Sequence, residues 1–174
     1  QIALTEEKIR ETRASFNQTA RKLTSARLKS AKKLSQSIST SMQQLDMPHG
    51  KFKVHLSSHE DDTPKPNGLD QITFNVSTNP DLPLDNISKV VSGGELSRIS
   101  LAIQANTAKH TAVPTVIYDE VDSGIGGDTA NTVGENLLAI SKYCQLICIT
   151  HSPQVASICD HQILVTKELL GKRN

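Results

Sequence analysis

The fold is decided by residues 115–150, which read TVIYDEVDSGIGGDTANTVGENLLAISKYCQLICIT. Two short apolar runs, Thr115 to Asp119 and Gln145 to Thr150, have the length and composition of buried strands. The segment between them, Asp128 to Ser141, repeats its apolar residues at helical spacing. A strand, a helix and a second strand in this order predict two parallel strands joined by a crossover helix.

The alternation of helix and strand continues on both sides of this unit. We expect a helix from about Glu95 to His110, a short helix from Pro153 to Ile158 and a further strand from Gln162 to Thr166. Short apolar strands separated by amphipathic helices predict an α/β fold, with a mostly parallel, buried sheet flanked by helices.

Before this region the hydrophobic period is two. Apolar residues alternate with polar ones in two runs, which contain Phe52, Val54 and Leu56, and then Ile72, Phe74 and Val76. The stretch between the runs, Ser57 to Asp70, carries four acids, two prolines and a glycine, as a loop does. We therefore expect a small antiparallel strand pair beside the α/β layer.

The first 46 residues form a third pattern. Apolar residues recur seven apart at Ile2, Ile9, Phe16 and Leu23, and the repeat resumes after a one-residue skip, which predicts a long coiled-coil helix. Polar Thr and Ser dominate its second seam position, so we expect one partner helix. The sequence Met-Pro-His-Gly at 47–50 ends it. We divide the chain into a helix, residues 1–46, and a body, residues 47–174.

Charge also separates the two parts. Residues 1–46 carry nine Lys and Arg against four Asp and Glu, whereas the remainder carries ten against fourteen, so the arm is basic and the body mildly acidic. The three cysteines lack disulfide spacing, and Cys148 lies in an apolar run, so a buried thiol explains it better than zinc. No apolar stretch of membrane-spanning length and no signal peptide stand out, and we expect a cytoplasmic protein.

Polar residues follow both strands of the 115–150 unit. Asp119 and Glu120 end the first strand, and His151 follows the second. Ligands of open α/β sheets bind beyond the carboxyl ends of strands. Asp119 can hold Mg²⁺ through its water shell while Glu120 orients or deprotonates a water, as in nucleotide hydrolysis. A solvated loop and a structural histidine remain the alternative interpretation.

Two adjacent glycines mark the start of the helix expected near residue 95. Ser92 and Glu95 have the spacing of a capping box, which alone explains the serine. Gly93 and Gly94 then occupy the first helical turn, where side chains are normally preferred. Bare backbone N–H groups at a helix start bind phosphate, so these residues predict a phosphate contact.

These motifs, in this order, resemble those of ABC-type ATPases of the SMC and Rad50 group. Residues 92–95 are similar to the signature motif, 117–120 to Walker B, 122–124 to the D-loop and His151 to the switch histidine. The stretches at 47–50, 77–80, 88–99, 119–122 and 150–156 look like the C-terminal lobe of that group's bacterial DNA-repair members. The resemblance covers nearly the whole chain.

The resemblance implies ATP and Mg²⁺ as cofactors and a role in double-strand break repair and recombination. Asp119 would serve Mg²⁺, Glu120 would be the general base and His151 would sense the γ-phosphate. The residues implied at an ATP molecule held by an opposing head are Ser92, Gly93, Gly94, Glu95 and Asp122. The partners implied are an N-terminal lobe carrying Walker A, a second head and DNA, with no membrane and a place near the nucleoid.

Two departures from the family pattern limit these expectations. The chain has no G-x-x-x-x-G-K-[ST], so the phosphate-binding loop must come from another lobe, and we expect the chain alone to be inactive. The family continues past the last strand, whereas here residues 165–174 end the chain, which is consistent with a piece of a longer protein. The alternative is a non-catalytic module that binds DNA or a partner through the basic helix. A Ser-His-Asp hydrolase is disfavoured because no G-x-S-x-G elbow exists.

Overall fold

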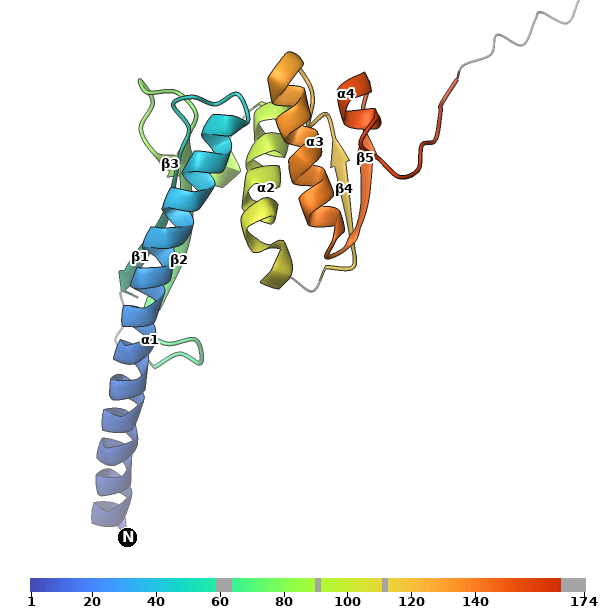
Figure 1. The fold of residues 1–174 in the computed structure, drawn as a ribbon. Helices are drawn as coiled ribbons and strands as arrows, with labels where there is room; N and C mark the ends of the chain where they lie inside the picture. Colours follow the sequence, from blue (N-terminus) through green and yellow to red (C-terminus); the bar gives the residue numbers. More distant parts are fainter. Residues whose placement is uncertain (59–63, 90–91, 111–112, 167–174) are drawn as a thin grey trace, which may run out of the picture.

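A computed structural model describes residues 1–58, 64–89, 92–110 and 113–166. One long helix stands out from a smaller body of helices and strands (Figure 1). The elements are α1 (Ile2–Gln44), β1 (Lys51–Ser58), β2 (Asp70–Ser77), β3 (Asp85–Asn86), η1 (Ile87–Lys89), α2 (Gly93–Thr107), η2 (Ala108–His110), β4 (Thr115–Asp119), α3 (Gly127–Ser141), β5 (Gln145–Ile149) and α4 (Pro153–Ala156). Residues 90–91 of the predicted motif stretch, 59–63 of the predicted loop and 167–174 lie outside the described residues.

Helix α1 has an exposed half and a packed half. The first repeat residues are exposed, with Ile2 at 78% and Ile9 at 61% of their full accessibility. Farther along the same stripe, Ile38 and Leu45 are completely buried, because α1 there packs on β1 and α2. The predicted long helix is confirmed, and the division of the chain at residue 46 stays a prediction.

The predicted antiparallel pair is also confirmed. Strands β1 and β2 pair in a register that sets Phe52 opposite Val76 and Val54 opposite Phe74. Phe52 and Val76 are buried, and the rings of Phe52 and Phe74 lie 5.7 Å apart. The two-residue strand β3, which the sequence pattern did not indicate, pairs with the end of β2.

Strands β4 and β5 are parallel, as residues 115–150 predict, with Thr115 opposite Gln145 and Asp119 opposite Ile149. Helices α2 and α3 lie on one side of this pair (Figure 1). Tyr118 of β4 is buried. The opposite face is open, and Ile117, Ile147 and Ile149 are exposed on it. The sheet is therefore covered on one face only, whereas the apolar strands predict burial on both.

The prediction of a strand over Gln162–Thr166 is wrong for this structure. The segment pairs with no strand among the described residues, and Ile163, Leu164 and Val165 are 92%, 88% and 87% exposed. An apolar run becomes a strand only where a neighbour accepts its backbone hydrogen bonds. Here the run extends beyond α4 without such a neighbour in the described part of the chain.

Candidate functional site

The start of α2 has the predicted capping geometry. Ser92 is the N-cap in an extended conformation, and its Oγ accepts a 3.5 Å hydrogen bond from the Glu95 backbone N–H. The Glu95 carboxylate accepts a hydrogen bond from Thr78 Oγ1 at 3.1 Å. The predicted hydrogen bond from the Glu95 N–H to the Ser92 hydroxyl is therefore confirmed. The capping-box pattern did not indicate that Thr78 would bond the Glu95 carboxylate.

Space is not the reason for glycine at positions 93 and 94. A methyl group on Gly93 would lie 3.5 Å from Glu120 Oε2, and one on Gly94 would lie 3.4 Å from Arg98 Nη1, both ordinary contacts. Neither glycine has a positive φ angle. Alanine, which favours a helix by about 1 kcal/mol over glycine, would therefore fit within this chain.

Two further residues tie α2 to the end of β4. Ser97 Oγ donates to the backbone oxygen of Asp119 at 3.0 Å, and buried Arg98 donates to the backbone oxygen of Ser123 at 3.0 Å. The sequence reasoning missed both residues. Sequence reasoning could have found them from their position one helical turn after the glycines, on the side of α2 that faces β4.

The two predicted carboxylates lie where β4 ends and the following loop begins. Asp119 and Glu120 are exposed, and Glu120 has a φ angle of +57°. Gly124 and Gly127 also have positive φ angles, which glycine adopts without steric cost. The helix after this loop, α3, has Gly126 as its N-cap and therefore no side-chain cap hydrogen bond.

Asp122 joins this loop to the loop after β5. Its side chain is 1% exposed, and Oδ2 accepts hydrogen bonds from Thr150 Oγ1 and, at 3.1 Å, from the Ser152 backbone N–H. His151 Nδ1 lies 4.0 Å from the same oxygen, while the His151 side chain is 81% exposed. The Asp122 carboxylate faces its own chain in this structure, and its action on an opposing head stays a prediction.

The hydrogen bonds to Asp122 keep it ionised. Burial opposes its charge, but the bonds from Thr150 and from the backbone N–H groups of Asp122 and Ser152, together with nearby His151, outweigh burial and lower its pKa below 3.8. Burial is also the main cause that raises the pKa of the Cys148 thiol to about 11.

The structure thus gathers the predicted residues at one edge. Gly93 lies beside Glu120, and Asp122 bonds the Glu120 loop to the residues that flank His151. Exposed carboxylate oxygens suit Mg²⁺ held partly through water, and the exposed backbone at residues 92–93 suits a phosphate. Three or more His, Cys, Asp or Glu side chains nowhere converge as metal ligands within the described ranges.

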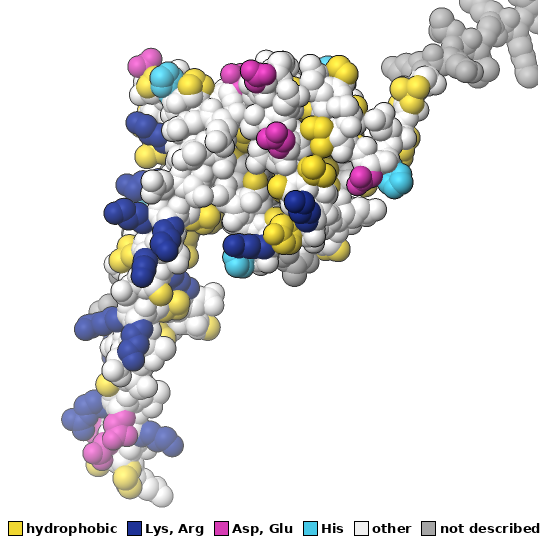
Figure 2. All heavy atoms as spheres, in the orientation of Figure 1, with side chains coloured by type: hydrophobic (Ala, Val, Ile, Leu, Met, Phe, Trp, Pro, Cys, Tyr) yellow, Lys and Arg dark blue, Asp and Glu magenta, His cyan; other side chains and the backbone are white. Residues whose placement is uncertain are grey.

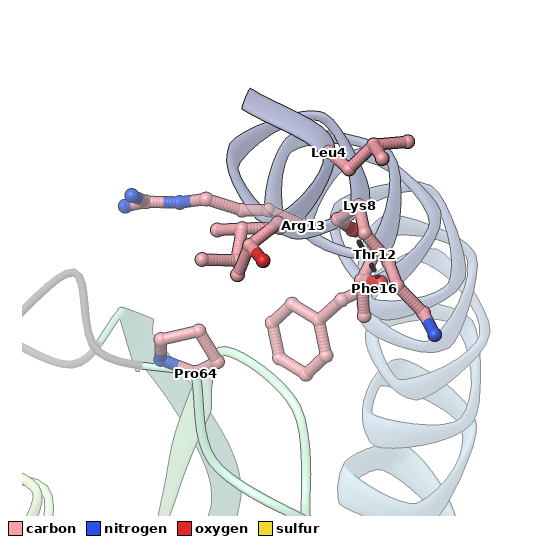
Figure 3. Close-up of a pocket in the computed structure, with 8 residues that line it drawn as sticks. Leu4, Lys8, Thr12, Arg13, Phe16 and Pro64 are labelled. Atoms are coloured by element: carbon pink, nitrogen blue, oxygen red, sulfur yellow. Dashed lines mark hydrogen bonds between the residues drawn. The ribbon is translucent and has the colours of Figure 1, made fainter. Parts of the chain in front are cut away.

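A separate hollow lies on the exposed half of α1, away from this edge. It measures about 1000 Å³, and the residues that line it include Leu4, Ile9, Phe16 and Pro64. Figure 3 shows the Phe16 ring on the side of α1 that faces Pro64. None of the helices that the structure describes is both long enough and apolar enough to cross a membrane.

Comparison with known proteins gives close sequence relatives. The chain is 47% identical over 156 residues to the DNA repair protein RecN of Vibrio cholerae, covering 88% of this chain and 27% of that protein. It is 45% identical over 149 residues to RecN of Haemophilus influenzae, covering 86% and 26%. The chain spans about a quarter of the length of these curated relatives. No protein-family model matches it.

Solved structures show the same fold at lower sequence identity. An Smc head domain with a coiled coil and joint from Pyrococcus yayanosii gives a TM-score of 0.59 at 18% identity, covering 88% of this chain and 28% of that one. An Smc head domain with an extended coiled coil from Pyrococcus furiosus, bound to the C-terminal domain of ScpA, gives 0.51 at 21% identity, covering 73% and 30%. With the relatives above, the chain belongs to the RecN family of bacterial DNA repair proteins and has the fold of part of an SMC-type head.

Proposed function

We propose that this chain supplies one half of a composite ATP site in an SMC-like ATPase of DNA double-strand break repair and recombination. The other half is an N-terminal lobe with a Walker A loop, and a second head closes the site over the nucleotide. The chain alone, which has no G-x-x-x-x-G-K-[ST], does not hydrolyse ATP. We place the whole protein in the cytoplasm, with the nucleoid.

The glycine pair carries this proposal. Neither packing nor backbone angle within the chain requires glycine at 93 and 94, although alanine would stabilise the helix. Their use therefore points to a contact outside the chain. Bare N–H groups at the positive end of a helix dipole, next to the exposed Ser92 hydroxyl, suit a phosphate held by an opposing head.

The open face of the β4–β5 pair supports the proposal that an N-terminal lobe packs against this chain. Ile117, Ile147 and Ile149 leave an apolar surface where a parallel sheet is normally covered. Strands or helices of an N-terminal lobe would bury this surface. The same docking would set a Walker A loop beside the carboxyl ends of β4 and β5, where Asp119 and Glu120 are exposed.

The residues at this edge have separate roles in the proposal. Asp119 would hold Mg²⁺ through water, and a metal ion held there would supply the positive charge that phosphoryl transfer needs. Glu120 orients the attacking water and accepts its proton. His151, exposed beyond β5, contacts the γ-phosphate, while Ser92 and Gly93 contact a nucleotide bound by the opposing head.

Substitution of Glu120 tests this assignment. The wild-type chain combined with an N-terminal RecN lobe should hydrolyse ATP in the presence of Mg²⁺. Glu120→Gln should lower the hydrolysis rate at least about 100-fold, because the general base is lost, with nucleotide binding retained. Phosphate release and fluorescent-nucleotide binding measure the two properties. Full hydrolysis by Glu120→Gln would remove Glu120 from this role.

The exposed basic face of α1 favours a second activity, DNA binding. Lys and Arg side chains line α1 in Figure 2, and Lys22, Lys29, Lys32 and Lys33 are exposed. Arg27 is not free for this purpose, because it pairs with Asp70 at 2.9 Å. The alternative interpretation is a solvent-exposed helix surface whose charges only keep the protein soluble.

A salt titration distinguishes the two interpretations. If the four lysines contact phosphates, DNA affinity should fall steeply with salt, and their joint replacement by Gln should flatten the dependence. Replacing Lys142 and Lys109, exposed basic residues of the body, provides a control. Affinity that does not change between low and high salt would exclude phosphate contacts by α1.

A further inference from the structure

The Asp122 carboxylate is almost fully buried, with 1% of its side chain exposed. Its Oδ2 accepts from the Thr150 hydroxyl and the Ser152 backbone N–H, and Thr150 Oγ1 also accepts from that N–H at 3.0 Å. Ser152 in turn is the N-cap of α4, where its Oγ accepts from the Val155 N–H. The carboxylate therefore closes a small network that ends in α4.

This network joins the two loops of the proposed site. Asp122 lies two residues after Glu120, and its partners Thr150 and Ser152 are the two neighbours of His151. Val121, between the two acids, is completely buried, so its side chain anchors the loop after β4 in the core. A shift of either loop would break hydrogen bonds to a buried charge, which is costly. The position of Glu120 is thus coupled to that of His151.

We propose that Asp122 is a positioning residue that orients the His151 ring, with Nδ1 toward its own carboxylate and Nε2 outward to the phosphate site. The ring is exposed, and Nδ1 lies 4.0 Å from Oδ2, within reach of a hydrogen bond after a small rotation. A carboxylate at Nδ1 favours the proton on that nitrogen. The role of the oriented ring at a phosphate rests on the proposed function. The orientation itself rests only on contacts within this chain.

The tautomer of His151 tests the orientation without any catalysis. In ¹⁵N NMR spectra of the full chain above pH 8, the neutral ring should carry its proton mainly on Nδ1. Exposed His110, on η2, serves as the control and should show the Nε2–H form that dominates in solution. Assignment uses His151→Gln. A His151 ring with the same tautomer ratio as His110 would overturn the proposal.

Two variants separate orientation from folding. Asp122→Asn should move His151 toward the tautomer ratio of His110, whereas Thr150→Val, which keeps the carboxylate, should leave Nδ1–H dominant. If Asp122→Asn does not fold, the comparison of His151 with His110 in the unchanged chain still decides. An unchanged ratio in a folded Asp122→Asn chain would contradict the proposal.

The effect on the reaction is a separate measurement. In the head completed by an N-terminal lobe, Asp122→Asn should lower kcat about tenfold and leave the KM for ATP nearly unchanged, since His151 is misdirected and not removed. Absence of hydrolysis in the wild-type head would refute the proposed function, while the tautomer result would still stand or fall independently. A raised KM with normal kcat would contradict the positioning role.

Discussion

Glu120 combines a proposed catalytic carboxylate with an unfavourable backbone conformation. Its φ angle of +57° lies in the left-handed region, where a residue with a Cβ costs about 1–2 kcal/mol. The turn is fixed by a 3.1 Å hydrogen bond from the Ser123 N–H to the Glu120 backbone oxygen. Such strain gathers at functional sites, where the surroundings hold a side chain in a required position.

This strain predicts an inverted preference at position 120. Glu120→Gly should be more stable than Glu120→Ala by about 1 kcal/mol, because only glycine adopts positive φ without a steric penalty. At exposed Asn131 in α3, the Ala variant should instead be the more stable one by about 1 kcal/mol. Urea unfolding of the four variants measures both differences. The same order at both positions would show that Glu120 is unstrained.

At the scale of elements, α1 is fastened to the body by polar contacts as well as by its apolar stripe. Thr24 Oγ1 and Arg27 Nη1 bond the two carboxylate oxygens of Asp70, at 2.8 and 2.9 Å, which ties α1 to β2. Farther along, Asn106 of α2 bonds Ser37 and Ser41 at 2.6 and 2.9 Å. Helix α2, whose N-cap is Ser92, is therefore attached to the long helix α1.

The Asp70 contact should contribute measurably to stability. The Asp70 side chain is 6% exposed and the Arg27 side chain 24%, so Asp70→Asn should lower the free energy of unfolding by about 1–2 kcal/mol. Asp85→Asn is the matched control, because the Asp85–Lys89 pair is exposed and contributes little. Equal effects of the two substitutions in thermal unfolding would contradict a structural role for the α1–β2 contact.

The elements that depend on local pattern could be predicted from the sequence. The antiparallel pairing of β1 with β2, the parallel strands and the cap at Ser92 all follow from residue spacing and capping chemistry. The Asp70 and Asn106 contacts could not, because they join residues 43 to 69 positions apart in polar stretches without periodicity. The positive φ angle of Glu120 could not be predicted, because no residue type at this position indicates it. The strand predicted at 162–166 is absent because it would need a neighbouring strand, which residue spacing does not reveal.

At the scale of the whole molecule, three surfaces are incomplete. The first half of α1 exposes its apolar stripe, the β4–β5 pair exposes one face, and the start of α2 presents bare backbone. In the proposed function a partner helix, an N-terminal lobe and a second head cover these surfaces in turn. The last of these is the central claim, because it requires Ser92 and Glu120 of one chain to serve different ATP molecules.

Mixing two inactive heads tests that claim most directly. Heads completed with an N-terminal lobe and carrying either Ser92→Arg or Glu120→Gln should each lose ATP hydrolysis. In an equal mixture, half of the randomly formed dimers are mixed and have one intact site of two, so about a quarter of wild-type activity should return. If Ser92 and Glu120 instead served one ATP molecule, each mixed site would keep one defect, and the mixture would stay inactive.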